Sequence, residues 1–90
     1  MNEESNRFFD DMFDYMVNNY SDGGLSARDL IGIGKDHDIS ISKLEADKAI
    51  EYFYDGIGIE YDKSIHKGPS EMKKVKVKAI DGLSKIFRKI

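Results

Sequence analysis

The sequence contains no cysteine, no tryptophan and only one proline. A chain without cysteine forms no disulfide, no thiolate metal site and no cysteine nucleophile. No apolar run approaches the roughly 18 residues that a membrane-spanning helix needs, and the polar, acidic start MNEESNRFF does not resemble a signal peptide. We therefore expect a cytoplasmic protein that does not enter a membrane.

What the 90 residues do contain is a mixture of apolar and charged side chains, at 40% and 34%. This composition is typical of a folded domain rather than a disordered chain. A chain of this length buries only about 60–65% of the surface that its unfolded form exposes, so its core is small. We expect one domain over residues 1–90.

The charges are distributed unevenly along the chain. The net charge is −3, but residues 1–62 contain fifteen acids and five Lys or Arg, whereas residues 63–90 contain two acids and nine Lys or Arg. This asymmetry predicts either a basic end that is available to an anionic partner or two ends that neutralise each other within one fold. The sequence leaves both interpretations open.

Three helices are expected in the first two thirds of the chain. Residues 6–20 place apolar side chains at helical spacing, and the glycines of the SDGG segment that follows end this helix. Ser26 is a suitable N-cap for a short helix over 27–33. A third helix is expected over 42–56, where Gly56 provides the stop. The aromatic residues of these helices are expected to form the core rather than a stacking platform.

The rest of the chain alternates between apolar and polar residues. The segments IGIEYD, residues 57–62, and KVKVKAI, residues 74–80, place every second side chain on one side, as half-buried strands do. The polar loop 63–72 would join them into a hairpin. Residues 81–90 have the spacing of a short amphipathic helix.

The second predicted strand carries a row of lysines, Lys74, Lys76 and Lys78. Cross-strand pairing with Glu60 and Asp62 would neutralise part of this row, at roughly 0.2–1 kcal/mol per pair. The free positive charge would then lie at the loop end of the hairpin, around Lys63, Lys67, Lys73 and Lys74. The loop end is therefore a better phosphate-binding candidate than the strand.

The order helix, helix, helix, strand, strand, helix resembles the winged helix-turn-helix family over about residues 8–90. The segment GGLSARDLI resembles the second helix of such domains. DISISKLEADKAIEYFYDGIGIEY resembles the tight turn, the third helix and the step into the first wing strand, and KVKVKAIDGLSKIFRKI resembles the second wing strand and the C-terminal helix. The resemblance implies an α+β fold with a two-stranded wing hairpin, and double-stranded DNA as the ligand.

The resemblance also implies where DNA would be contacted, because the third helix of the family enters the major groove and the wing touches the minor groove or phosphates. Carried onto this sequence, the DNA-binding candidates are Ser40, Ser42, Lys43, Asp47, Lys63, His66, Lys67, Lys73 and Lys74. Residues 40–55, however, contain four acids and no Arg, Asn or Gln for base contacts. We therefore expect the basic wing to dominate any DNA binding.

Two functions are consistent with these features. The first is a small winged-helix regulator of transcription, from a plasmid or a phage, that binds DNA. The second is a phage-type adaptor or inhibitor that binds a protein through its acidic N-terminal half. The last apolar residues either cap the core or form a homodimer seam; they are Leu83, Ile86, Phe87 and Ile90.

Other chemistry is weakly indicated. Residues 18–29 resemble a damaged calcium-binding EF-hand loop, with Tyr20 at its third position and Asp29 in place of the bidentate glutamate at its twelfth. A helix stop followed by an N-cap explains the same residues. The DHD segment, 36–38, is expected to be a solvated loop because adjacent side chains diverge. No phosphate loop or acid–base pair is present, so we expect no cofactor, no metal and no enzymatic activity.

Overall fold

The computed structural model of the protein describes residues 3–20 and 23–87, and every regular element within these residues is helical. The elements are α1 (Glu3–Asn19), α2 (Ala27–Asp36), α3 (Lys43–Tyr52), the π-helical segment η1 (Phe53–Ile57), α4 (Gly58–Ile65) and α5 (Pro69–Ile86). The predicted α+β winged helix is therefore wrong, because the two ranges contain no strand and no wing hairpin.

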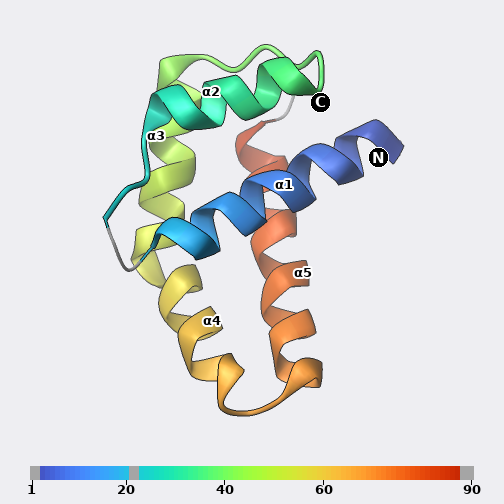
Figure 1. Cartoon of the computed structure of the whole chain (residues 1–90), viewed down its shortest axis with the longest axis vertical. Coiled ribbons are helices and arrows are strands. Elements are labelled where there is room, and N and C mark those ends of the chain that lie inside the picture. The colour runs from blue at the N-terminus through green and yellow to red at the C-terminus, as the bar shows by residue number, and fades with distance from the viewer. Residues whose placement is uncertain (1–2, 21–22, 88–90) are drawn as a thin grey trace.

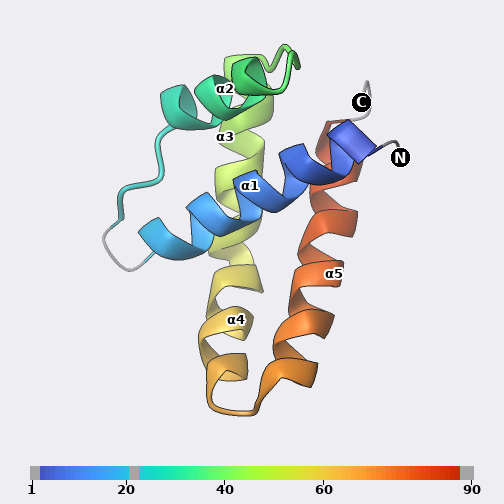
Figure 2. The same ribbon diagram turned by 45° about the vertical axis from the view of Figure 1, so that its right-hand side comes forward.

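The helices form two layers (Figure 1). α3, η1 and α4 follow one another along one side of the molecule, and α5 returns antiparallel to α4 after a short loop. α1 crosses in front of this pair, and α2 lies over the end where α3 begins (Figure 2). The molecule measures 35 × 28 × 19 Å. The α2–α3 loop and the α4–α5 loop consequently lie at opposite ends of the long axis.

α1 supplies the centre of the core because its apolar residues recur every three or four positions. Those that are at most 2% exposed are Phe8, Phe9, Met12, Phe13 and Met16. The Phe87 ring packs edge-on against Phe8 at a centroid distance of 5.8 Å. The Phe53 ring packs in the same way against Phe13 at 6.3 Å. The prediction that these phenylalanines form the core is confirmed.

The predicted end of the third helix at Gly56 is also confirmed. Asp55 and Gly56 leave helical conformation within η1, and Gly56 has φ 139°, a value that glycine adopts far more readily than other residues. The chain then turns helical again at Gly58, which packs closely against aromatic rings. A Cβ at Gly58 would lie 2.6 Å from the Phe53 ring and 2.8 Å from the Tyr20 ring. The absence of a side chain therefore lets α4 approach the core.

Residues 57–62 form the start of α4 rather than a strand. Ile57 and Gly58 are buried, Tyr61 is half-buried and Ser64 is buried, which is a helical repeat. The alternating pattern placed Ile59 on the same face as Ile57, but Ile59 is 45% exposed. A six-residue segment contains too few apolar residues to separate a period of 2.0 from one of 3.6.

Residues 74–80 lie in the middle of α5 for the same reason. Val75 is half-buried, and Ala79 and Leu83, at steps of four residues, are fully buried. Val77, which the alternation had placed in the core, is 62% exposed. A single exposed valine between lysines therefore imitated a strand, although lysine is a good helix former.

The long loop predicted over 63–72 is also wrong. α4 continues to Ile65, and α5 begins at Pro69. Proline at the first helical position is favourable because its fixed φ suits a helix and its missing N–H would have no partner there. Glu71 adds an acid in the first turn of α5, where it interacts favourably with the helix dipole. Residues 66–68 alone connect the two helices.

The residues predicted either to cap the core or to form a dimer seam mostly cap the core. Leu83 and Phe87 are fully buried within the chain, and Ile86 packs partly buried against the same cluster. Ile90 lies outside the described residues. The seam proposed from the sequence would need Leu83 and Phe87 to project from the surface, which they do not.

Within the described ranges, no helix combines the length and the apolar composition that crossing a membrane requires.

Candidate functional site

The residues predicted to contact DNA do not share one surface. Ser40, Ser42 and Lys43 lie at the α2–α3 end of the molecule (Figure 1). The opposite end carries the remaining basic candidates, Lys63, His66, Lys67, Lys73 and Lys74. A recognition helix beside a wing would have brought both groups to one face. The helical hairpin of α4 and α5 instead carries the second group away from α3.

Ser42 has a structural role at the α2–α3 end. Its Oγ accepts a hydrogen bond from the Glu45 backbone N–H at 3.1 Å, and its own backbone N–H donates to Glu45 Oε1 at 3.0 Å. This capping box makes Ser42 the N-cap of α3. Ser40 is exposed in the preceding loop, and Lys43 is exposed in the first turn of α3.

The end formed by residues 63–74, called the tip below, contains the predicted basic loop residues. Lys63 lies in the last turn of α4, His66 is its C-cap, and Lys67 lies in the loop to α5. Lys73 and Lys74 lie in the first turns of α5. All five side chains are exposed. The sequence placed positive charge at this end of the hairpin, and the structure does so with helices instead of strands.

The lysines of α5 beyond the tip have ion-pair partners. Lys76 Nζ lies 3.2 Å from Asp10 Oδ1 and 5.9 Å from the Phe13 ring centroid. Lys78 Nζ lies 3.2 Å from Glu60 Oε1, so Glu60 pairs with this lysine row as predicted, but between helices rather than strands. Asp62, the other predicted partner, has no ion pair among the described side chains. Lys85 pairs within α5, with Asp81 at 3.3 Å.

Fewer of the tip lysines have an ion-pair partner. Lys74 Nζ lies 3.4 Å from Glu71 Oε1, an exposed pair of the kind that contributes little. Lys63, Lys67 and Lys73 have no ion-pair partner among the described side chains. The unneutralised positive charge of the described C-terminal part is therefore concentrated at the tip.

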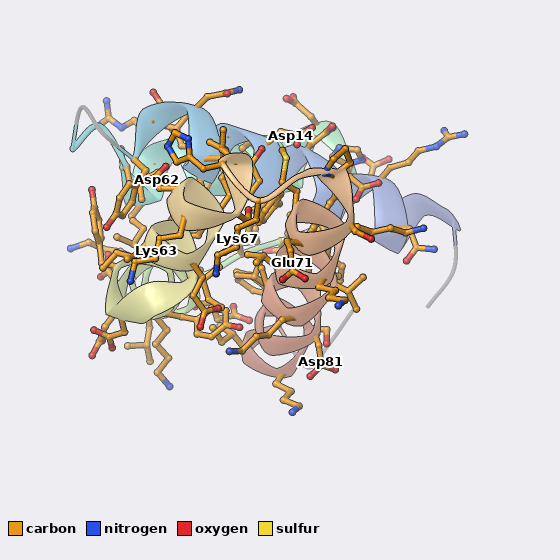
Figure 3. All side chains as sticks on the ribbon, turned by 90° about the horizontal axis from the view of Figure 1, so that it is seen from below. Asp14, Asp62, Lys63, Lys67, Glu71 and Asp81 are labelled. Atoms are coloured by element: carbon orange, nitrogen blue, oxygen red, sulfur yellow. The ribbon has the colours of Figure 1, made fainter. Side chains whose placement is uncertain are left out.

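The tip side chains line two concavities. A groove of about 270 Å³ between α4 and α5 is lined by Glu60, Lys63, Ser64, Lys67, Glu71 and Val75. Figure 3 looks onto the tip and shows the Lys67 side chain between those of Lys63 and Glu71. A shallower hollow on the outer side of α5 is lined by Ser70, Lys73, Lys74 and Val77. Ammonium and hydroxyl groups such as those of the tip are suited to phosphate oxygens.

Sequence reasoning missed a third concavity, at the α2–α3 end. It has a volume of about 440 Å³, and its basic lining residues are Arg28, Lys35 and Lys43. Lys43 was a candidate, but Arg28 and Lys35 were not. Their spacing of seven residues, two turns of helix, could have placed them on one face of α2. The signal was weak because each stands among acids in the sequence.

His37 is not in a solvated loop, as the sequence had suggested. Its ring side chain is only 11% exposed, and Nε2 lies 2.7 Å from Asp11 Oδ2. The ring also packs edge-on against Phe8, at a centroid distance of 6.1 Å. His37 thus fastens the end of α2 to α1. The sequence carries no local signal for this contact, because the partners are 26 residues apart.

The segment that resembles a calcium loop is held by hydrogen bonds. The Tyr15 hydroxyl donates to the Asp29 carboxylate, and its oxygen also lies 3.1 Å from the Gly24 carbonyl oxygen. Burial, together with the hydrogen bond to Asp29, raises the pKa of Tyr15 to about 12. Asp22, in the same segment, lies outside the described residues. No group of three or more His, Asp or Glu side chains in residues 6–20 and 23–87 is placed to hold a metal ion.

The site is thus defined by its residues and their geometry, since comparison with protein-family models, curated proteins and solved structures finds no match to this chain.

Proposed function

We propose that the protein binds nucleic acid through phosphate contacts at the tip. The observation that carries the proposal is the pairing pattern of the lysines. Those on the rest of described α5 have carboxylate partners, whereas Lys63, Lys67 and Lys73 have none among the described side chains. A polyanion gains most from cations that are not already neutralised, because each neutralised phosphate releases condensed counterions.

The expected contact is with the phosphate backbone rather than with bases. The tip offers ammonium groups, the Ser70 hydroxyl and the His66 imidazole, but no Arg, Asn or Gln, which are the usual readers of base edges. The net charge of −3 limits the affinity. We assign the interaction to the cytoplasm, which is the compartment that a chain without disulfides suits.

A salt titration of duplex DNA binding, followed by fluorescence anisotropy of a labelled 20-base-pair duplex, tests this proposal. Three phosphate contacts predict a slope of about −3 in a plot of log K against log salt concentration. Substitution of the three tip lysines, Lys63→Gln, Lys67→Gln and Lys73→Gln, should remove most of this slope and lower the affinity at least tenfold at low salt.

The matched control removes the same charge from paired positions of α5, by Lys76→Gln, Lys78→Gln and Lys85→Gln. This control should lose much less affinity, because those lysines are engaged with Asp10, Glu60 and Asp81. Equal losses in the two triple variants would contradict a role for the tip and would indicate a general charge effect. No binding by the wild type at low salt would contradict the proposal as a whole.

A second candidate function, the binding of a basic protein, is favoured by the outer face of α3. Asp47 and Glu51 are exposed, like-charged and one turn apart, which destabilises a helix by a few tenths of a kcal/mol. Leu44, which helical spacing places on the same face as Asp47, is 64% exposed. An exposed leucine beside two acids is complementary to a peptide that carries Lys or Arg and leucine.

Binding of a synthetic amphipathic peptide rich in Lys and Leu, measured by calorimetry, tests this second candidate. The double variant Asp47→Lys and Glu51→Lys should weaken peptide binding at least tenfold but strengthen duplex binding. The matched control, Asp36→Lys and Asp62→Lys, changes the net charge equally at exposed sites elsewhere. Glu45 is left unchanged because its side chain caps α3. Equal weakening in both double variants would exclude a specific face on α3.

A further inference from the structure

The hollow at the α2–α3 end lies at the opposite end of the molecule from the tip. It has a volume of about 440 Å³, within the usual range of small-molecule sites. Its lining residues are Ala27, Arg28, Ile31, Gly32, Lys35 and Lys43. Positions 28, 31, 32 and 35 fall on one face of α2, since they are spaced by three or four residues, and Lys43 completes the rim from α3.

The charge of this hollow has a single sign. Three of its six lining residues are basic, and no acidic residue is among the described side chains that line it. Arg28, Lys35 and Lys43 have no ion-pair partner in the described part of the chain. This differs from α5, where Lys76, Lys78 and Lys85 are paired. Three unneutralised cations around one concavity repel each other, and an anion relieves that repulsion.

The floor of the hollow contains a glycine that the fold does not require. Gly32 lies inside α2, where glycine destabilises a helix relative to alanine. At Gly34, Gly58 and Gly82, a Cβ would collide with neighbouring atoms of the chain. At Gly32, by contrast, an added Cβ would meet nothing within 4 Å. The missing side chain leaves space in the hollow rather than room for another part of the protein.

We propose that this hollow binds a small organic phosphate with a flat apolar body. The Arg28 guanidinium can hold two phosphate oxygens at once, and Lys35 and Lys43 supply the remaining positive charge. The apolar body lies on the surface left open by Gly32, against the Ile31 side chain. The site is independent of nucleic-acid binding at the tip, because the two lie at opposite ends of the long axis.

The probe for this proposal is phenyl phosphate, which combines a dianion with a flat apolar ring. In a titration followed by amide chemical shifts of the full chain, the largest changes are expected in residues 27–35 and at Lys43. Inorganic phosphate lacks the apolar ring and phenol lacks the phosphate, so each should bind at least tenfold more weakly than phenyl phosphate. Equal affinity for inorganic phosphate would overturn the proposal, because the apolar floor would then contribute nothing. Shifts centred on the tip would overturn it as well.

The sharpest variant is Gly32→Leu, which fills the floor with a good helix former. It should weaken phenyl phosphate binding at least tenfold while the thermal midpoint stays equal or rises. Arg28→Gln and Lys35→Gln, at exposed positions that do not threaten the fold, should each weaken binding at least threefold. Lys48→Gln, an exposed lysine of α3 outside the hollow, is the matched control and should change nothing. Unchanged affinity in both Gly32→Leu and Arg28→Gln would overturn the proposal.

Discussion

The region around α1 and the tip differ in what holds them in place. Residues 8–16 contribute five side chains that are at most 2% exposed, whereas Ser64 is the one buried residue of the tip. The α1 region is held by aromatic rings packed edge-on, and the tip is held by the short helix connection and one exposed ion pair. Stability is therefore concentrated around α1, and the tip can carry unpaired charge at little expense to the fold.

The largest expected effect tests this difference directly. Phe53→Ala removes a buried ring of η1 that packs against Phe13 of α1 and should lower the free energy of unfolding by about 3–5 kcal/mol. Because whole domains are stable by only about 5–15 kcal/mol, this is a large fraction of the total. Val77→Ala on α5 near the tip, where the side chain is 62% exposed, should change stability by less than about 0.5 kcal/mol. Urea titration measures the free energy of unfolding of both variants. Comparable losses would contradict the difference in stability between the α1 region and the tip.

A second prediction concerns the contact that joins α3 to α5 between the two regions. The Tyr52 hydroxyl donates to the Lys78 carbonyl at 3.2 Å, and a Cβ at Gly82 would overlap the Tyr52 ring. Gly82→Ala should therefore destabilise the protein by about 1–3 kcal/mol through overpacking.

The effect of Gly82→Ala on stability should change sign once the Tyr52 ring is removed. In a Tyr52→Ala background, Gly82→Ala should stabilise by up to about 1 kcal/mol, because alanine is the better helix former. Thermal unfolding of the two pairs of variants gives this comparison. If Gly82→Ala has the same effect in both backgrounds, the ring does not occupy this space.

A third prediction uses the pH dependence of the α1 region. The pKa of Tyr15 is raised from its ordinary value of 10 to about 12, so the folded state holds this proton more tightly than the unfolded state does. The resulting stability is fully present below about pH 10 and is lost as the pH rises towards 12. Tyr15→Phe should flatten the decline in stability over this range. Denaturant midpoints at pH 9 and pH 11 measure the change; an unaltered decline would indicate another group. Residues 63–74, which form the tip, contain no tyrosine.

The smallest effect on stability is expected at the tip. Each of Lys63→Gln, Lys67→Gln and Lys73→Gln should change the free energy of unfolding by less than about 0.5 kcal/mol, because these side chains are exposed and unpaired among the described residues. Chemical denaturation of each variant provides the measurement. A loss above 1 kcal/mol at any of the three would show that the tip lysines support the fold.

The sequence predicted the first half of the chain better than the second. The helices over 6–20, 27–33 and 42–56 were placed close to α1, α2 and α3, because long apolar periods and glycine breaks are local signals. The segments 57–62 and 74–80 were misassigned as strands. Their periodicity depended on Ile59 and Val77, whose exposure is decided by which neighbours the helix packs against.

The candidate site was predicted in part. The concentration of free charge around Lys63, Lys67 and Lys73 followed from the charge of the two halves and from the pairing of Glu60 with a lysine of the row, and both features hold in the helical hairpin. The hollow at the α2–α3 end was not predicted. A concavity forms between helices, so it depends on how α2 meets α3 and not on any short segment.

The sequence by itself determined the composition of the core, the cap of α3, the break at Gly56 and the basic character of the C-terminal part, because these depend on residue type and local spacing. Tertiary structure alone decided the rest. It made the second half helical, since α5 buries Ala79 and Leu83 and leads to Phe87, whose ring packs against Phe8 of α1. It also separated the two basic ends, because an antiparallel pair of helices carries its connecting loop away from the rest of the molecule.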